Sequence, residues 1–127
     1  MSATVKGSNL KNKRDIMRIT TRDDAIPMKD VSNGTEIAMV AYVIEEVTKD
    51  RGVDPSGEVF DCILVLDANG QLFATRSETF IEKVLDIMAE LAADGEDVEN
   101  LKENPIMLRI TQQKSRNGNN FVSCSLA

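Results

Sequence analysis

The amino-acid sequence predicts a mostly β fold, a barrel with one helix, and three observations support this class. Several short segments alternate apolar and polar residues and are rich in Val and Ile, which is typical of half-buried strands. Tight turn signals join two pairs of these segments directly, which favours antiparallel pairing over a parallel βαβ arrangement. One long segment has the apolar spacing of an amphipathic helix.

The first three strands are expected in the first half of this barrel. Thr35–Thr48 is rich in Val, Ile and Tyr and is predicted as a long first strand, and Glu58–Leu66 is the second. The tight turn Asp67–Gly70 leads into the third strand, Gln71–Arg76. Gly70 is well placed for a positive φ in this turn.

The helix is expected at about Phe80–Ala93. Apolar residues recur there at the i, i+3, i+4, i+7 spacing of one helix face. Thr79 and Glu82 form a capping box at its start, and Gly95 supplies the stop at its end. The helix therefore falls between the third predicted strand and the fourth.

Two more strands complete the predicted fold. They are Ile106–Gln112 and Asn120–Leu126, joined by the hairpin signal of residues 115–119. The resulting order, β-β-β-α-β-β, is characteristic of the OB-fold, a five-stranded, partly open Greek-key barrel. An α+β sheet with one packed helix is the alternative.

The N-terminal residues lack a sustained period of either kind. We expect residues 1–33 to form a basic, flexible arm, with a short extended piece at Ile16–Thr21, and residues 34–127 to form the OB-fold domain. Six basic residues and one acidic residue lie between Met1 and Arg22. The arm is therefore cationic in a chain whose net charge is −6.

The remaining charge is also unevenly distributed along the chain. The helix and the loop after it, Glu78–Glu103, hold nine acidic and two basic residues. The last segment, Ile106–Ala127, holds three basic residues and no acidic one. An acidic face on one side and cations on another suit a protein that binds polyanions, although such clusters also serve solvation.

Composition argues against several classes of function. Histidine is absent, which excludes Ser-His and Cys-His catalytic pairs and zinc sites with His ligands. Cys62 and Cys124 have no metal-ligand spacing and are interpreted as small core residues. No Gly-rich phosphate loop is present, so we expect no enzymatic activity, no cofactor and no metal. The absence of a signal peptide or a long apolar run predicts a cytoplasmic protein without a membrane association.

Alternation along the strands predicts which side chains face outward. If the smoother aliphatic sets form the core, the outward set contains Tyr42, Phe73, Phe121 and Arg109, while Phe60 and Phe80 belong to the core and the helix packing. An OB barrel binds single strands by stacking bases on such outward aromatics, while basic residues follow the backbone. The loops that frame the groove in this fold would add four cations: Lys49, Arg51, Lys114 and Arg116.

The chain resembles the small single-stranded DNA-binding proteins of bacteriophages. The segments that carry the resemblance are GTEIAMVAYVIEE, FATRSETFIEKVLDI and KSRNGNNFVSCSL, within residues 33–126. The resemblance implies sequence-independent coating of single-stranded DNA during replication or recombination, in the host cytoplasm. Many such proteins end in an acidic tail that recruits partners, whereas here the acidic block lies at the helix and the loop after it. That face is the expected docking surface for replication or recombination proteins.

The alternative is an OB-type protein–protein interaction or assembly module that binds no nucleic acid. Its support is a second apolar face on the first two strands, formed by Val40, Ile44, Ile63 and Val65. Such a face needs a cover, which either the N-terminal arm or a homodimer partner would supply.

Overall fold

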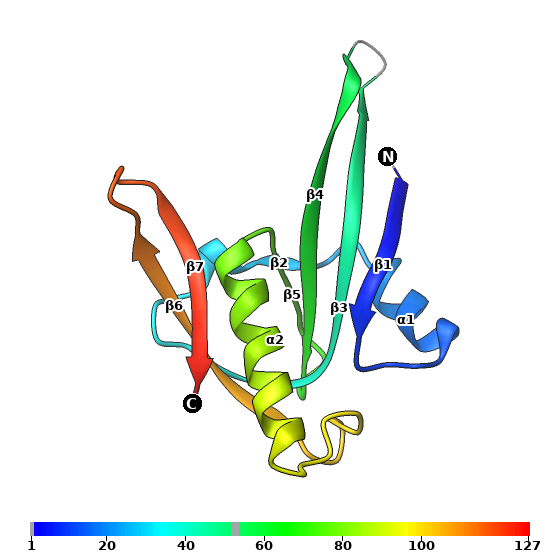
Figure 1. The fold of residues 1–127 in the computed structure, drawn as a ribbon, viewed down its shortest axis with the longest axis vertical. Helices are drawn as coiled ribbons and strands as arrows, with labels where there is room; N and C mark the ends of the chain where they lie inside the picture. Colours follow the sequence, from blue (N-terminus) through cyan, green and yellow to red (C-terminus); the bar gives the residue numbers. More distant parts are fainter. Residues whose placement is uncertain (1, 52–53) are drawn as a thin grey trace.

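The computed structural model describes the backbone of residues 2–51 and 54–127, and the side chains within these ranges except at positions 2, 3, 49–51 and 54–58. This part of the chain forms seven strands and two α-helices (Figure 1). The strands are β1 (Ser2–Ser8), β2 (Ile26–Pro27), β3 (Glu36–Arg51), β4 (Asp54–Asp67), β5 (Leu72–Thr75), β6 (Ile106–Lys114) and β7 (Asn120–Leu126). The helices are α1 (Lys13–Thr20), the short 3-10 helix η1 (Met28–Asp30) and α2 (Glu78–Ala93).

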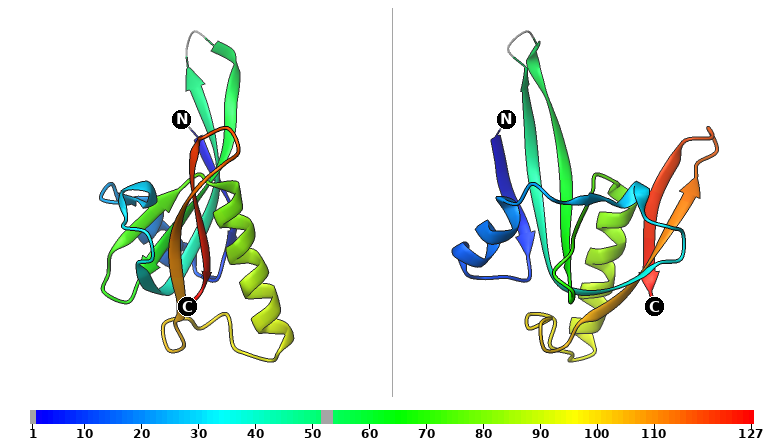
Figure 2. Two further views of the ribbon diagram at one scale, coloured as in Figure 1. Left: turned by 90° about the vertical axis from the view of Figure 1, so that its left-hand side faces the viewer. Right: turned by 180° about the vertical axis from the view of Figure 1, so that it is seen from behind.

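The strands form one curled sheet in the order β2-β5-β4-β3-β6-β7, with β1 also paired to β3. The long β3 organises it: residues 36–39 pair with β6, residues 43–48 with β1, and β4 runs along its other edge. All pairs are antiparallel except β2 with β5. The β3–β4 and β6–β7 hairpins project from the same end of the molecule (Figures 1 and 2).

Most of the predicted elements are confirmed. The five predicted strands correspond to β3, β4, β5, β6 and β7, and the predicted helix corresponds to α2. Gly70 and Gly95 have φ values of +83° and +85°, which fits the hairpin turn and the end of α2. The strand count is not five, however, because β1 and β2 join the same sheet.

The predicted capping box is wrong, because α2 begins two residues earlier than expected. Ser77 is the N-cap, and its hydroxyl oxygen accepts a hydrogen bond from the Phe80 amide at 3.3 Å. The same hydroxyl donates to the Val122 carbonyl of β7. This bond to another strand gives Ser77 an advantage over Thr79 that local sequence does not show.

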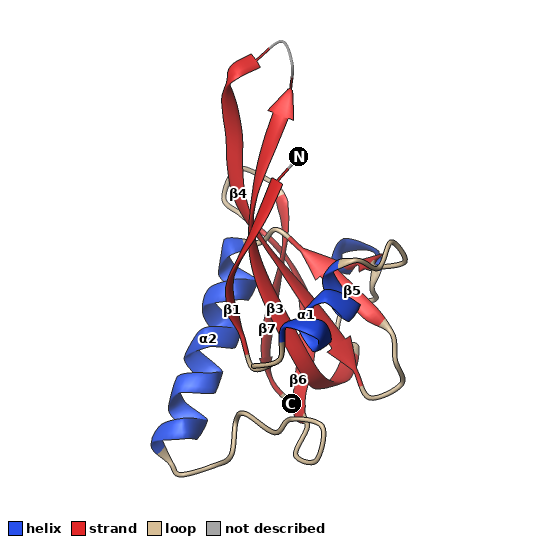
Figure 3. Cartoon of the chain, turned by 90° about the vertical axis from the view of Figure 1, so that its right-hand side faces the viewer, coloured by secondary structure: helices blue, strands red, loops and turns tan. Residues whose placement is uncertain are grey.

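The N-terminal segment, residues 1–33, also differs from its description as a flexible arm with a short extended piece. The predicted extended piece is wrong, since Lys13–Thr20 is helical and Asn12 caps it by accepting from the Arg14 amide at 2.8 Å. Helix α1, which was not predicted, lies on the face of the sheet opposite α2 (Figure 3). The division between residues 33 and 34 stays a prediction, but the N-terminal residues pack against the sheet.

Two apolar clusters lie on the two faces of the sheet. The main core contains the apolar face of α2, including Phe80, together with Met28 and Leu108, all fully buried. The second cluster lies under α1, where Ile19 packs with Leu72. Both faces of the central strands are therefore covered, which explains why these strands are apolar on both sides.

Candidate functional site

A groove with a volume of about 480 Å³ opens between β5 and β7. We call it the β5–β7 groove. Among the described side chains, its lining holds two cations and no acidic residue, in a chain whose net charge is −6. The lining residues are Ala25, Pro27, Met28, Lys29, Cys62, Ala74, Thr75, Arg76, Ser77, Asn120, Phe121 and Val122.

The groove exists because β5 and β7 do not pair with each other. The β2–η1 segment lies between them, with β2 paired to β5 and the Met28 side chain fully buried in the main core. The Gln112 amide nitrogen of β6 donates to the carbonyls of Met28 and Val31, both at 2.9 Å. These bonds hold the segment against the β6–β7 hairpin, so that the two strand edges stay apart.

One wall of the groove carries a stacked guanidinium. The guanidinium carbon of Arg76 lies 3.6 Å from the centroid of the Phe60 ring, which is half-buried. Such a cation–π contact contributes roughly 0.5–2 kcal/mol, depending on solvent exposure. The stack therefore presents a flat, positively charged surface beside the groove.

The opposite wall carries Phe121 and Asn120 at the start of β7. Phe121 is half-buried, so part of its ring is accessible. Of the three aromatic residues predicted to face outward, Phe121 is the one that lines the groove. The aromatic wall and the Arg76–Phe60 stack come from strands far apart in the sequence.

Unpaired cations lie in and near the groove. Lys29 lines it, and Lys114 and Arg116 lie at the tip of the β6–β7 hairpin, which projects from the same end as β3–β4 (Figure 2). All three are exposed, and no ion pair to them is present among the described side chains. The predicted Lys49 and Arg51 lie outside the described side chains.

Arg109 is exposed as predicted but does not line the groove. Its guanidinium donates to a Glu36 carboxylate oxygen at 3.1 Å, across the β3–β6 pair. An exposed pair of this kind contributes little to stability. Arg109 therefore has a local acidic partner that Lys29, Lys114 and Arg116 lack within the described region.

The predicted outward orientation of Tyr42 is wrong. Its side chain is 7% exposed and belongs to the main core. The reason is a β-bulge at Val40, between the pairs Met39–Asp67 and Ala41–Leu66, which reverses the alternation along β3. Residues of odd number face the main core before the bulge, and residues of even number face it afterwards. The pKa of the Tyr42 hydroxyl is raised by burial.

The predicted outward orientation of Phe73 is also wrong, for a different reason. Phe73 is 5% exposed and packs in the main core beside its cross-strand partner Val65. Its neighbour Leu72 points the other way into the cluster under α1. At this end of β5 both faces are covered, one by the main core and the other by the N-terminal segment.

The second apolar face of the first two strands is covered within the chain. Ile44, Ile63 and Val65 are buried in the main core with the apolar face of α2, so these three need no dimer partner to cover them. Val40, the fourth residue predicted on this face, is half-buried at the bulge. The N-terminal segment covers the other side, where Val43 packs in the cluster with Ile19.

The base of the groove holds a half-buried thiol. The pKa of Cys62 is raised by burial and by the nearby Glu45, while Arg76 lowers it. Burial also raises the pKa of Glu45 itself. The other cysteine, Cys124, is buried, and its pKa is raised to about 11. At neutral pH both thiols are protonated, and Cys62 is the accessible one.

Sequence reasoning missed Arg76 and assigned Phe60 to the core. A signal was available in the turn Asp67–Gly70, since the β4–β5 register pairs Ile63 with Thr75. Continued by one residue, that register places Arg76 opposite Cys62 and diagonal to Phe60, which is within reach of a long side chain.

No protein-family model, curated protein or solved structure matches the chain. Within the described residues, no group of three or more Cys, Asp and Glu side chains is arranged to hold a metal ion. No helix in the same part of the chain has the length and apolar character that a membrane crossing requires.

Proposed function

We propose that the chain is a single-stranded DNA-binding protein with an OB-like barrel, and that it binds the strand in the β5–β7 groove. The observation that carries the proposal is a groove with Phe121 on one wall, the Arg76–Phe60 stack beside the other, two cations, and no acidic residue among its described lining side chains, in an acidic protein. A cationic groove combined with stacking surfaces is the usual design for binding single strands without sequence preference. The order β-β-β-α-β-β of β3 to β7 supports the OB-like interpretation.

Bases would stack on the two walls of the groove, on Phe121 and on the guanidinium face of Arg76. Stacking contributes roughly 1–3 kcal/mol per base, and two surfaces would account for a substantial share of the affinity. Lys29, Lys114 and Arg116 would contact phosphates, for which they have no competing ion pair among the described residues. By this proposal the protein coats single strands in replication or recombination.

The direct test is fluorescence anisotropy with labelled oligo-dT of about 30 nucleotides, an oligo-U of equal length and a duplex control. We expect salt-sensitive binding to oligo-dT, with a log–log slope of about 0.7 for each neutralised phosphate. Arg76→Ala and Phe121→Ala should each weaken binding roughly five- to a hundredfold.

Arg109→Ala is the matched control, because it removes an exposed arginine of the same sheet outside the groove. It should change the affinity much less than Arg76→Ala. Absence of binding to oligo-dT at low salt would overturn the proposal. Equal losses for Arg76→Ala and Arg109→Ala would show that charge alone, and not the groove, determines binding. Tighter binding to oligo-U would reassign the ligand to RNA.

A further inference from the structure

A second groove lies at the other end of the molecule, away from the hairpin tips. It has a volume of about 240 Å³ and lies between the end of α2, the loop after it, and the ends of β6 and β7. Of the residues that the structure describes, two acidic ones and no basic one line it. We call it the acidic groove and define it by Leu91, Glu96, Asp97, Val98, Met107 and Leu126.

The size and exposure of the acidic groove indicate the kind of occupant. Its volume is below the roughly 300–1,000 Å³ of pockets that enclose small molecules, so it suits a side chain better than a ligand. Met107 and Leu126 are 41% and 51% exposed, which leaves apolar surface in contact with water. Exposed apolar surface with a polar rim is typical of protein–protein contacts. The occupant should therefore present an apolar side chain among cations.

Helix α1 presents that combination. Met17 is 48% exposed, and Lys13 and Arg14 precede it by four and three residues, so all three share one helix face. We call these three residues the α1 knob. Lys13 and Arg14 are exposed and form no ion pair with the described side chains, whereas Arg18 is paired with Asp15 at 3.0 Å. Its two free cations suit an acidic rim.

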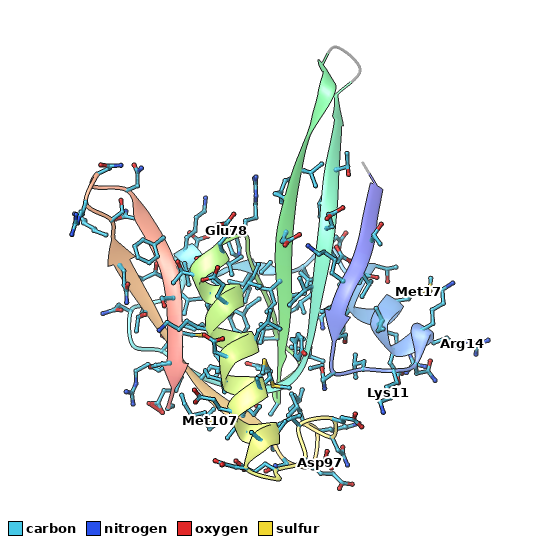
Figure 4. All side chains as sticks on the ribbon, in the orientation of Figure 1. Lys11, Arg14, Met17, Glu78, Asp97 and Met107 are labelled. Carbon is cyan, nitrogen blue, oxygen red and sulfur yellow. The ribbon has the colours of Figure 1, made fainter. Side chains whose placement is uncertain are left out.

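The α1 knob and the acidic groove are separate surfaces of one molecule, with Met17 at the right and Met107 at the lower left in Figure 4. None of the three knob residues lines the acidic groove of its own chain. We propose that the α1 knob of one copy docks in the acidic groove of the next, which gives a head-to-tail contact. Such a heterologous contact produces a ring if its rotation closes and an open chain if it does not. This proposal does not depend on the binding of DNA.

The charges on both surfaces are exposed, so the contact should be weak and salt-sensitive. At physiological ionic strength, salt screens the attraction between exposed charges that are more than about 8 Å apart. Met17 supplies the apolar part of the contact, which salt does not screen. We therefore expect association at high protein concentration and low salt, with species larger than dimers.

Sedimentation velocity of the full chain without DNA, from micromolar to millimolar concentration, tests the proposal. Met17→Asp places an acid in the knob, and Glu96→Lys with Met107→Lys places cations in the groove. Each variant should weaken association roughly tenfold or more at low salt. Leu85→Asp is the matched control, since Leu85 is an exposed apolar residue of α2 (44%) outside the groove.

A mixture of the two variants gives the sharpest outcome. The intact knob of the groove variant can enter the intact groove of the knob variant, so the mixture should form 1:1 dimers and nothing larger. A wild-type chain that stays monomeric at all concentrations, a Met17→Asp variant that associates like wild type, or a mixture without dimers would each overturn the proposal. Oligo-dT binding by Met17→Asp should remain, because the knob is outside the β5–β7 groove. Failure of one proposal is thus distinguishable from failure of the other.

Discussion

Replacing Met28 tests whether the N-terminal segment is an integral part of the barrel. The Met28 side chain is fully buried in the main core, between the edges of β5 and β7. Truncation of a buried Met to Ala typically costs about 2–5 kcal/mol, through lost burial and the cavity left behind. The β5–β7 groove adjoins this position, and water could enter the cavity from it, so we expect about 2–4 kcal/mol for Met28→Ala.

Equilibrium unfolding in urea, followed by circular dichroism, measures this loss directly. The neighbouring exposed Lys29 provides the control, since Lys29→Ala should change stability by no more than about 0.5 kcal/mol. Gln112→Ala should cost about 1–3 kcal/mol, because the carbonyls of Met28 and Val31 lose their donor. A Met28→Ala loss below about 1 kcal/mol would refute the reasoning, and residues 1–33 would then behave as a dispensable arm.

Three further predictions concern the groove, the helix cap and pH. Cys62 should react with maleimide in the native protein, whereas Cys124 should not. Oligo-dT at about 100 times its Kd should slow the reaction of Cys62 about a hundredfold. An unchanged rate of labelling would show that the DNA strand binds outside the β5–β7 groove. Ser77→Ala should lower stability by about 0.5–2 kcal/mol through loss of the cap, whereas Thr79→Ala should have little effect; a reversed order in urea unfolding would restore the capping box. Burial raises the pKa of Glu45, so the protonated carboxyl group favours the folded state and the ionised one disfavours it. The free energy of unfolding should therefore fall as pH rises through the pKa of Glu45 in the folded protein. Glu45→Gln should therefore stabilise the protein at neutral pH and not below pH of about 4, and equal effects at both would contradict this.

The strands and the helix that depend on short-range sequence patterns were predicted correctly. The strands β3 to β7, the turn at Gly70 and helix α2 were predicted because alternation, apolar spacing and turn residues report on the chain within a few positions. The same logic failed at residues 13–20, where an amphipathic helix of eight residues carries many charges and few apolar residues. Such a short helix is stabilised by its packing on the sheet, through Ile19, more than by its own propensity.

The candidate site was predicted only in part, because it depends on which face of each strand is buried. Phe121, Lys114 and Arg116 could be placed from the last hairpin, since its register follows directly from its turn. Tyr42 could not, because a single extra residue at Val40 reverses the alternation without any glycine or proline to mark it.

The local elements, the uneven distribution of charge and the lack of histidine follow from the order and type of the residues alone. Three features needed the folded chain: the N-terminal segment covers the second face, Met28 lies between β5 and β7, and Arg76 stacks on Phe60. These features join residues that are far apart in the chain. They form only when the side chains of the helices and the sheet pack together and their polar groups find hydrogen-bond partners. Alternation along one strand contains no information about which element will cover it.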